Sequence, residues 1–182
     1  MKPFIAACLL AVSFVVPVQA QPASAVRTAS FVDASGDTPV FYSLESNTPV
    51  SATQAEFGGW DISMKGTELR VNGGVVMVDS AFAEVTEAPA DGYVSDTPEQ
   101  TAIPGGSGKG WFNYDPTTHI ITPVENRTFV LKLKNGRYAK LRVTDYYRQE
   151  FTAAGPQPVP RHWSFRFELA PEGSRQFEAA KD

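Results

Sequence analysis

Few side chains in this sequence could bind a transition metal. It contains two histidines, His119 and His162, and one cysteine, Cys8, which lies in an apolar run near the N-terminus. Met64 and Met77 add two thioether sulfurs. Imidazole nitrogen suits iron, copper or zinc, and thioether sulfur is a softer donor. The chain therefore offers a small set of neutral metal donors and no cluster of thiols.

The sequence shows no arrangement of residues that indicates an enzyme. Hydrolysis requires a nucleophile with its base, or paired carboxylates in a cleft. Asp115 lies near His119, but neither a nucleophile elbow nor a metal-binding pair of histidines accompanies them. The glycine-rich run 105–110 is not a phosphate-binding loop, because no Ser or Thr follows Lys109 and Trp111 begins a predicted strand. We therefore expect a binding protein and not an enzyme.

Residues 1–20 have the features of a secretory signal peptide. Lys2 is the only charge, Phe4–Val16 is an apolar run too short to span a bilayer, and Val18-Gln19-Ala20 forms a small-residue cleavage site. Cys8 lies inside the apolar run, which favours an ordinary signal residue over a lipidation site. We expect a secreted or periplasmic protein with no transmembrane segment once the signal is removed.

Composition limits the class of protein further. The net charge is −4 and the isoelectric point about 5.2, which gives no indication of nucleic acid or anionic membrane as a partner. Without Cys8 the chain has no cysteine, so disulfides are excluded. We divide the chain into a signal peptide (1–20), a leader (21–25), one β domain (26–170) and a polar tail (171–182) that forms a short helix or a frayed end.

Hydrophobic periodicity predicts an all-β, single-domain protein built from antiparallel sheet. In the last predicted strand, Trp163, Phe165 and Phe167 share one face while Ser164 and Glu168 share the other, which indicates a half-buried strand. No sustained helical period is present. The predicted strands are Arg27–Val32, Val40–Ser43, Trp60–Met64, Glu68–Val71, Val75–Val78, Phe112–Tyr114, Phe129–Lys134, Arg137–Tyr147 and His162–Leu169.

Two segments are predicted to be long surface loops rich in glycine and proline. Residues 87–110 contain three prolines and the glycine-rich run before Trp111. Residues 153–160 contain Pro156, Pro158 and Pro160, which favour extended polyproline-like geometry. Loops carried by a rigid sheet often hold functional residues.

The register of one hairpin can be predicted from its side chains. A two-residue turn at Asn135-Gly136 would place Leu131 opposite Lys140 on the buried face. A three-residue loop of Lys134, Asn135 and Gly136, with the glycine in the left-handed conformation, places Leu131 opposite Ala139 instead. The second register is predicted because it keeps one face apolar and sets Phe129 opposite Leu141. The other face then carries Lys132, Lys140 and Arg142, which are expected to be solvated or to meet an anion.

Several segments, in their order along the chain, resemble the HmuY-like family of bacterial haem-binding proteins. They are Val32–Ser35, Trp60–Gly74, Ala90–Tyr93, Gly110–Tyr147 and Trp163–Phe167. The resemblance implies an extracytoplasmic all-β protein that takes part in iron acquisition. Such a protein holds haem between loops, with His or Met as axial ligands, and passes it to a transport system.

The resemblance makes His119 the first candidate for an axial ligand, because it lies in the loop after the Trp111 strand. In the haem-binding relatives a second ligand comes from an extended hairpin after the Asp-Gly-Tyr element, here Asp91–Tyr93. The corresponding segment 94–110 contains no His, Met, Cys or Tyr. Haem would then be five-coordinate, or held by a different pair, or replaced by another ligand.

Four other residues complete the candidate haem site. Met77 and Met64 are weaker candidates for the second ligand, since strand spacing predicts that both fill gaps in the core. Lys109 and Arg142 are candidates to pair with the haem propionates. His162 is expected at an exposed or edge position, because its side chain faces away from that of Trp163.

These observations leave three classes of function. The first is a haem-binding protein that captures haem for transfer to an uptake system, with an outer-membrane receptor as a possible partner. The alternative is a secreted β-scaffold that binds a non-haem ligand such as a glycan, a peptide or a partner receptor, with Tyr114, Tyr146 and Tyr147 as exposed contacts. A structural or adhesive domain is the third.

Overall fold

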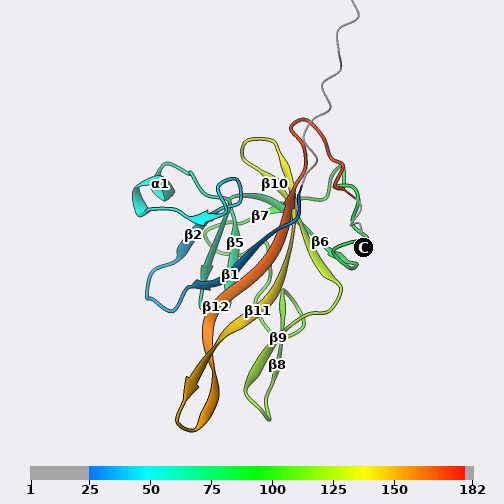
Figure 1. The fold of residues 1–182 in the computed structure, drawn as a ribbon. Coiled ribbons are helices and arrows are strands. Elements are labelled where there is room, and N and C mark those ends of the chain that lie inside the picture. The colour runs from blue at the N-terminus through cyan, green and yellow to red at the C-terminus, as the bar shows by residue number, and fades with distance from the viewer. Residues whose placement is uncertain (1–24, 179–182) are drawn as a thin grey trace, which may run out of the picture.

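The computed structural model describes residues 25–178, which form an antiparallel all-β domain as predicted (Figure 1). One sheet has six strands and a second has four, and their apolar faces enclose the core. The six-stranded sheet has the order β1 (Arg27–Asp33), β12 (Gly155–Leu169), β11 (Tyr138–Thr152), β10 (Arg127–Leu133), β6 (Gly73–Asp79) and β7 (Val94–Ser95). The four-stranded sheet has the order β3 (Thr48–Pro49), β2 (Val40–Ser43), β4 (Ile62–Lys65) and β5 (Glu68–Val71). A separate hairpin pairs β8 (Phe112–Asp115) with β9 (Ile120–Pro123), and the short helix α1 (Ala52–Glu56) follows β3.

The predicted strands all overlap observed ones, and the β10–β11 register is confirmed. Leu131 pairs with Ala139 and Phe129 with Leu141. Gly136 has a φ of +83° and its N–H donates to the Leu133 carbonyl at 2.9 Å, as the three-residue loop requires. The strands β3, β7 and β9 were not predicted; β3 and β7 are only two residues long.

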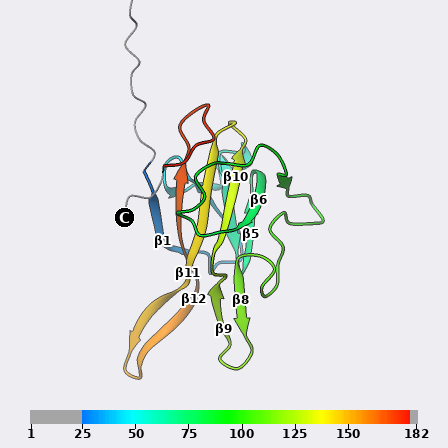
Figure 2. The same cartoon turned by 90° about the vertical axis from the view of Figure 1, so that its right-hand side faces the viewer.

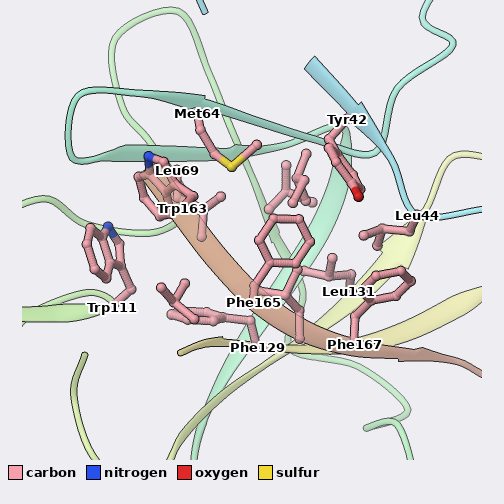
Figure 3. Close-up of a cluster of buried hydrophobic side chains, with 14 of the residues drawn as sticks. Tyr42, Leu44, Met64, Leu69, Trp111, Phe129, Leu131, Trp163, Phe165 and Phe167 are labelled. Atoms are coloured by element: carbon pink, nitrogen blue, oxygen red, sulfur yellow. The ribbon is translucent and has the colours of Figure 1, made fainter. Parts of the chain in front are cut away.

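The core is built on the aromatic face of β12 (Figure 3). Trp163, Phe165 and Phe167 are each at most 1% exposed, and Phe165 packs edge-on against Tyr42 of the four-stranded sheet at 5.1 Å. Burying each of these rings stabilises the fold by about 2 kcal/mol. The prediction that β12 is half-buried is wrong at Glu168, which is 0% exposed on the opposite face.

That opposite face carries a buried ion pair, so of the two expected environments Lys140 meets an anion and is not solvated. Lys140 is 1% exposed; its ammonium lies 3.1 Å from Glu168 and donates to the Val85 carbonyl at 2.9 Å. The rings of Phe82 and Phe177 lie 4.6 and 5.2 Å from the Lys140 nitrogen. A segment remote in sequence therefore covers the polar face of the predicted hairpin, and the anion that Lys140 meets belongs to the chain itself.

Part of the predicted C-terminal tail packs on this face. Phe177 is 5% exposed and its N–H donates to the Thr86 carbonyl at 2.8 Å, while the Glu178 N–H donates to Glu168 at 2.6 Å. The expectation of a short helix or a frayed end is therefore wrong for residues 171–178. This segment contains no helix, donates a hydrogen bond to Glu168 and covers the buried ion pair. Residues 179–182, like the predicted signal peptide and residues 21–24 of the leader, lie outside the described residues.

The prediction that residues 153–160 form a loop is correct only for the turn at Ala153 and Ala154, and it is wrong for 155–160. β12 begins at Gly155 and pairs with the end of β11, so that the two strands form a ribbon reaching beyond the sheet (Figure 1). Pro156, Pro158 and Pro160 face Phe151, Gln149 and Tyr147. Prolines at every second position lack their N–H on the same edge of the strand, so the other edge can still pair.

The buried ion pair gives the first prediction. Glu168→Ala should lower the free energy of unfolding by about 3 kcal/mol or more, because it leaves the Lys140 ammonium buried without its carboxylate. Urea denaturation measures this, with Glu68→Ala as the control, since Glu68 pairs with Arg70 at the surface and should contribute less than about 1 kcal/mol. Combining Lys140→Met with Glu168→Leu should recover most of the loss. If Glu168→Ala and Glu68→Ala lowered the free energy of unfolding equally, this account would be contradicted.

Candidate functional site

Two hairpins project in the same direction from one end of the domain, which is the lower end in Figures 1 and 2. One is β8–β9, and the other is the outer part of the β11–β12 ribbon. The Tyr147 hydroxyl of β11 accepts the Ile121 N–H of β9 at 2.9 Å, which joins the two hairpins near their base.

Both hairpins are rooted in a cluster of aromatic rings. Trp111, directly before β8, packs at a tilt against Trp163 of β12, with ring centroids 4.5 Å apart. The Tyr146 ring lies 5.3 Å from that of Trp111 and 5.5 Å from that of Trp163. The Trp111 indole N–H donates to the Thr67 carbonyl at 2.8 Å. These contacts are buried, so the bases of the hairpins are held in place while their tips extend into solvent. The expectation that Tyr146 is an exposed contact is wrong, because its side chain is 4% exposed within this cluster.

His119 lies in the turn between β8 and β9, as the sequence predicted, and is exposed. Its φ of +58° lies in the left-handed region, which is uncommon for a histidine. Asp115 shapes this turn by accepting the Thr117 N–H at 2.8 Å and the Thr118 hydroxyl at 2.9 Å. These two hydrogen bonds, the backbone one first, hold the pKa of Asp115 below its ordinary value. At neutral pH Asp115 is therefore ionised, and its carboxylate stabilises the turn in which His119 lies.

The imidazole of His119 has one nitrogen engaged. Nδ1 lies 2.6 Å from the Tyr114 hydroxyl, across the hairpin. When Nδ1–H donates to the tyrosine oxygen, Nε2 carries the lone pair that a metal needs. Tyr114, which is exposed as predicted, thus orients the imidazole. Sequence reasoning missed this role, since it depends on how a short turn brings residues five apart into contact.

The two methionines lie in different environments. Met64 is 0% exposed within the core, as predicted, and has no surface toward solvent. The prediction that Met77 also fills the core is wrong, because it is 37% exposed at the end of β6. Its sulfur lies 3.9 Å from Arg127, which also donates to the carbonyls of Lys109 and Gly110 at 3.2 and 2.8 Å.

Arg127 therefore places Met77 and the backbone of Lys109 near the start of β8. His119 is in the turn at the other end of that strand, a length of about 10 Å. The structure thus brings Met77 and Lys109 together, and it keeps them apart from His119.

Arg142 and His162 occupy other faces of the β11–β12 pair. Arg142 pairs in register with Arg166, whose guanidinium lies over Phe82 on the sheet face away from the aromatic core. The pKa of Arg166 is lowered, first by burial and then by the charge of Arg142. The prediction that His162 is exposed or at an edge is wrong, because it is 6% exposed. Its Nδ1 lies 3.0 Å from the Pro160 carbonyl and its Nε2 3.8 Å from Asp33, so β1 covers it.

Two surface clefts have linings that do not include His119. A cleft of about 1060 Å³ runs between β1 and the β2–β3–α1 region, and another of about 570 Å³ has Trp60 and Phe41 in its wall. The residues that line these two clefts do not include His119. Within residues 25–178, no group of three or more His, Cys, Asp or Glu side chains could hold a metal ion. In the same range, no helix has the length and apolar character needed to cross a membrane.

Comparisons with known proteins identify the family. Residues 35–158 match the HmuY protein family, and because this is more than half of the chain, the chain belongs to that family. No curated protein shows a significant sequence match.

Solved structures share the fold. The apo HmuY analog of Tannerella forsythia has 18% identity and a TM-score of 0.55, covering 82% of this chain and 96% of its own. Apo PinO from Porphyromonas gingivitis has 16% identity and a TM-score of 0.55, covering 84% and 100%. A putative lipoprotein from Bacteroides fragilis has 19% identity and a TM-score of 0.53, covering 81% and 92%. At these identities the likeness establishes the all-β HmuY-like fold.

The junction of the two hairpins gives the second prediction. Tyr147→Phe should destabilise the β9–β11 contact by about 1 kcal/mol, because the Ile121 amide loses its acceptor. Amide hydrogen exchange at Ile121 should become several times faster while the core amides of β12 are unchanged. The control is Tyr114→Phe, whose hydroxyl contacts the His119 ring and not this amide. Unchanged exchange in Tyr147→Phe would show that the hairpins are not held together here.

Proposed function

We propose that this chain is an extracytoplasmic haem-binding protein of the HmuY type, and not an enzyme. It would capture haem and pass it to an uptake system, with an outer-membrane receptor as its partner. The observation that carries the proposal is the Tyr114–His119 pair, which presents an imidazole with a free Nε2 at a rigidly rooted hairpin. Membership of the HmuY family supports the same ligand.

The neighbouring ribbon would supply an apolar wall. Along β11, alternate side chains share a face, so Tyr147, Gln149 and Phe151 point to one side. The Tyr147 hydroxyl contacts β9, so this is the side of the His119 hairpin. Phe151 is 83% exposed, which is unusual for a phenylalanine without a partner. A planar macrocycle between the hairpins would cover this ring and meet the imidazole at its iron.

One protein ligand is expected. Segment 94–110 carries no second donor, Met64 is enclosed in the core, and Met77 lies near the start of β8. His119 would therefore bind a five-coordinate haem iron, leaving one axial position open. Lys109 and Arg142 remain candidates for the propionates only if haem extends far from the turn, since neither is brought beside His119 in this structure.

One observation favours a second candidate function, a secreted β-scaffold that binds a ligand other than haem. His119 is not among the residues that line the clefts of about 1060 and 570 Å³, so neither cleft contains the candidate iron ligand. A haem site at His119 would instead form between the two exposed hairpins. Haem titration separates the two functions.

The third prediction tests the iron ligand. Haem added to the protein should produce a Soret shift that disappears in His119→Ala, because no other described imidazole is exposed. His162→Gln is the matched control; it removes the buried imidazole and should leave the shift intact. Circular dichroism confirms that each variant is folded. The absence of a shift in the unaltered protein, under both oxidising and reducing conditions, would reject haem as the ligand.

The fourth prediction concerns Tyr114 as a positioning residue. Tyr114→Phe should weaken haem binding by about tenfold, because the imidazole loses the partner that sets its orientation. The ¹⁵N shifts of the His119 ring should show a change in the proportion of its two tautomers in the haem-free variant. Tyr93→Phe is a control tyrosine remote from the turn, whose hydroxyl donates to the Pro89 carbonyl at 3.0 Å. Unchanged ring shifts in Tyr114→Phe would remove this role.

A further inference from the structure

The cleft between β1 and α1 has the size and lining of a small-molecule site. Its volume is about 1060 Å³, and ligand pockets commonly span about 300 to 1,000 Å³. Residues 28–33 of β1 form one wall. The rest of the lining is largely apolar and includes Val40, Phe41, Pro49, Ala52 and Ala55.

Phe31, which lines the cleft, has an unusual backbone conformation. Its φ is +56°, a conformation that a bulky side chain rarely adopts, and its N–H donates to the Ser164 hydroxyl at 3.1 Å. The irregular pairing of β1 with β12 between Ala29 and Val32 allows this geometry. As a result the ring lines the cleft and remains 51% exposed. Strained residues held by their surroundings are concentrated at binding sites.

The charges in the lining are both negative. Asp33 and Glu56 line the cleft at β1 and α1, and no lysine, arginine or histidine is among the lining residues. Hydrogen bonds from the Ser35 hydroxyl and N–H hold the pKa of Asp33 below its ordinary value, so it is ionised at neutral pH. His162 approaches Asp33 to 3.8 Å, but it is buried behind β1 and does not line the cleft.

The same lining is unsuited to haem. It contains no His, Met or Cys, and the Tyr42 hydroxyl already contacts Asn47 at 2.9 Å on a side chain that is 2% exposed. The propionates of haem would meet Asp33 and Glu56 and be repelled. We propose that this cleft is a second binding site, distinct from the His119 hairpin, for a small amphiphilic cation with an apolar body and an ammonium group.

A matched pair of probes tests the charge and the place of binding. 4-Phenylbutylamine and 4-phenylbutyrate share one apolar skeleton and carry opposite charges. In titrations followed by ¹H–¹⁵N correlation spectra, the amine should cause saturable shifts at the amides of Phe31, Ala52 and Ala55, and the carboxylate should bind at least several-fold more weakly. Equal binding of both probes, no binding of the amine, or shifts confined to other elements would each overturn the proposal.

Three variants locate the interaction. Ala55→Trp fills the cleft and should abolish the shifts caused by the amine. Glu56→Gln should weaken the amine about twofold to fivefold, as expected for one partly exposed charge, and leave the carboxylate unchanged or tighter. The matched control Glu125→Gln removes an exposed acid from the turn before β10 and should change nothing. Equal effects of Glu56→Gln and Glu125→Gln would reject the specific role of Glu56.

Phe31→Asn provides a variant that is not expected to unfold. Asparagine tolerates the left-handed conformation, so the melting temperature should be unchanged or higher, while binding of the amine should weaken. Retained binding in this variant would exclude Phe31 from the site. Haem titration of the Ala55→Trp variant distinguishes the two sites. The Soret shift of this variant should equal that of the unaltered protein, because filling the cleft should not affect haem binding at His119.

Discussion

The antiparallel pairing of β11 with β12, whose register shifts between Val143 and Tyr147, is the constraint on which the rest of the structure depends. Each strand is 15 residues long, and their inner halves carry the aromatic core on one face and the Lys140–Glu168 pair on the other. Their outer halves leave the sheet as a ribbon beside the β8–β9 hairpin (Figure 2). Because one pair of strands spans both regions, the packing of the core determines where the projecting hairpins start and which way Tyr147 faces.

The two ends of this pair differ in how firmly they are held. On the inner half, a buried ion pair is enclosed by two aromatic rings and by the segment around Phe177, so removing either charge would leave the other without compensation. On the outer half, the contacts are a hydroxyl–amide bond at Tyr147 and an exposed Tyr114–His119 pair. A rigid base with exposed tips suits a site that must accept a ligand and release it again.

The apolar cleft beside β1 shows that a donor atom and a deep recess need not occur together in this fold. His119 has the chemistry for iron but stands on a hairpin, whereas the cleft has the volume and the apolar wall but two carboxylates and no metal donor. The four-stranded sheet and α1 form the second wall of the cleft, and the register irregularity in β1 turns Phe31 into it. This chain thus presents two chemically different surfaces, an exposed imidazole on a hairpin and an apolar cleft with two carboxylates in its lining.

Local patterns were sufficient for nine of the strands in whole or in part and for the β10–β11 register, because alternation and a glycine in the left-handed region depend on neighbouring residues alone. The same reasoning placed His119 in its turn. It failed at Lys140 and His162, which are buried by segments remote in sequence, and at Met77, where strand spacing could not show that the core ends before it. The loop prediction for the prolines of 156–160 failed because a proline is compatible with a strand only when its missing N–H lies on the unpaired edge.

The sequence by itself therefore determined the all-β class, the family and the turn that carries the candidate ligand. Tertiary structure alone decided which polar groups are buried and where the clefts lie, since both depend on contacts between elements remote in sequence. The contact of Tyr114 with the imidazole needed the three-dimensional shape of the turn, which brings residues five apart together.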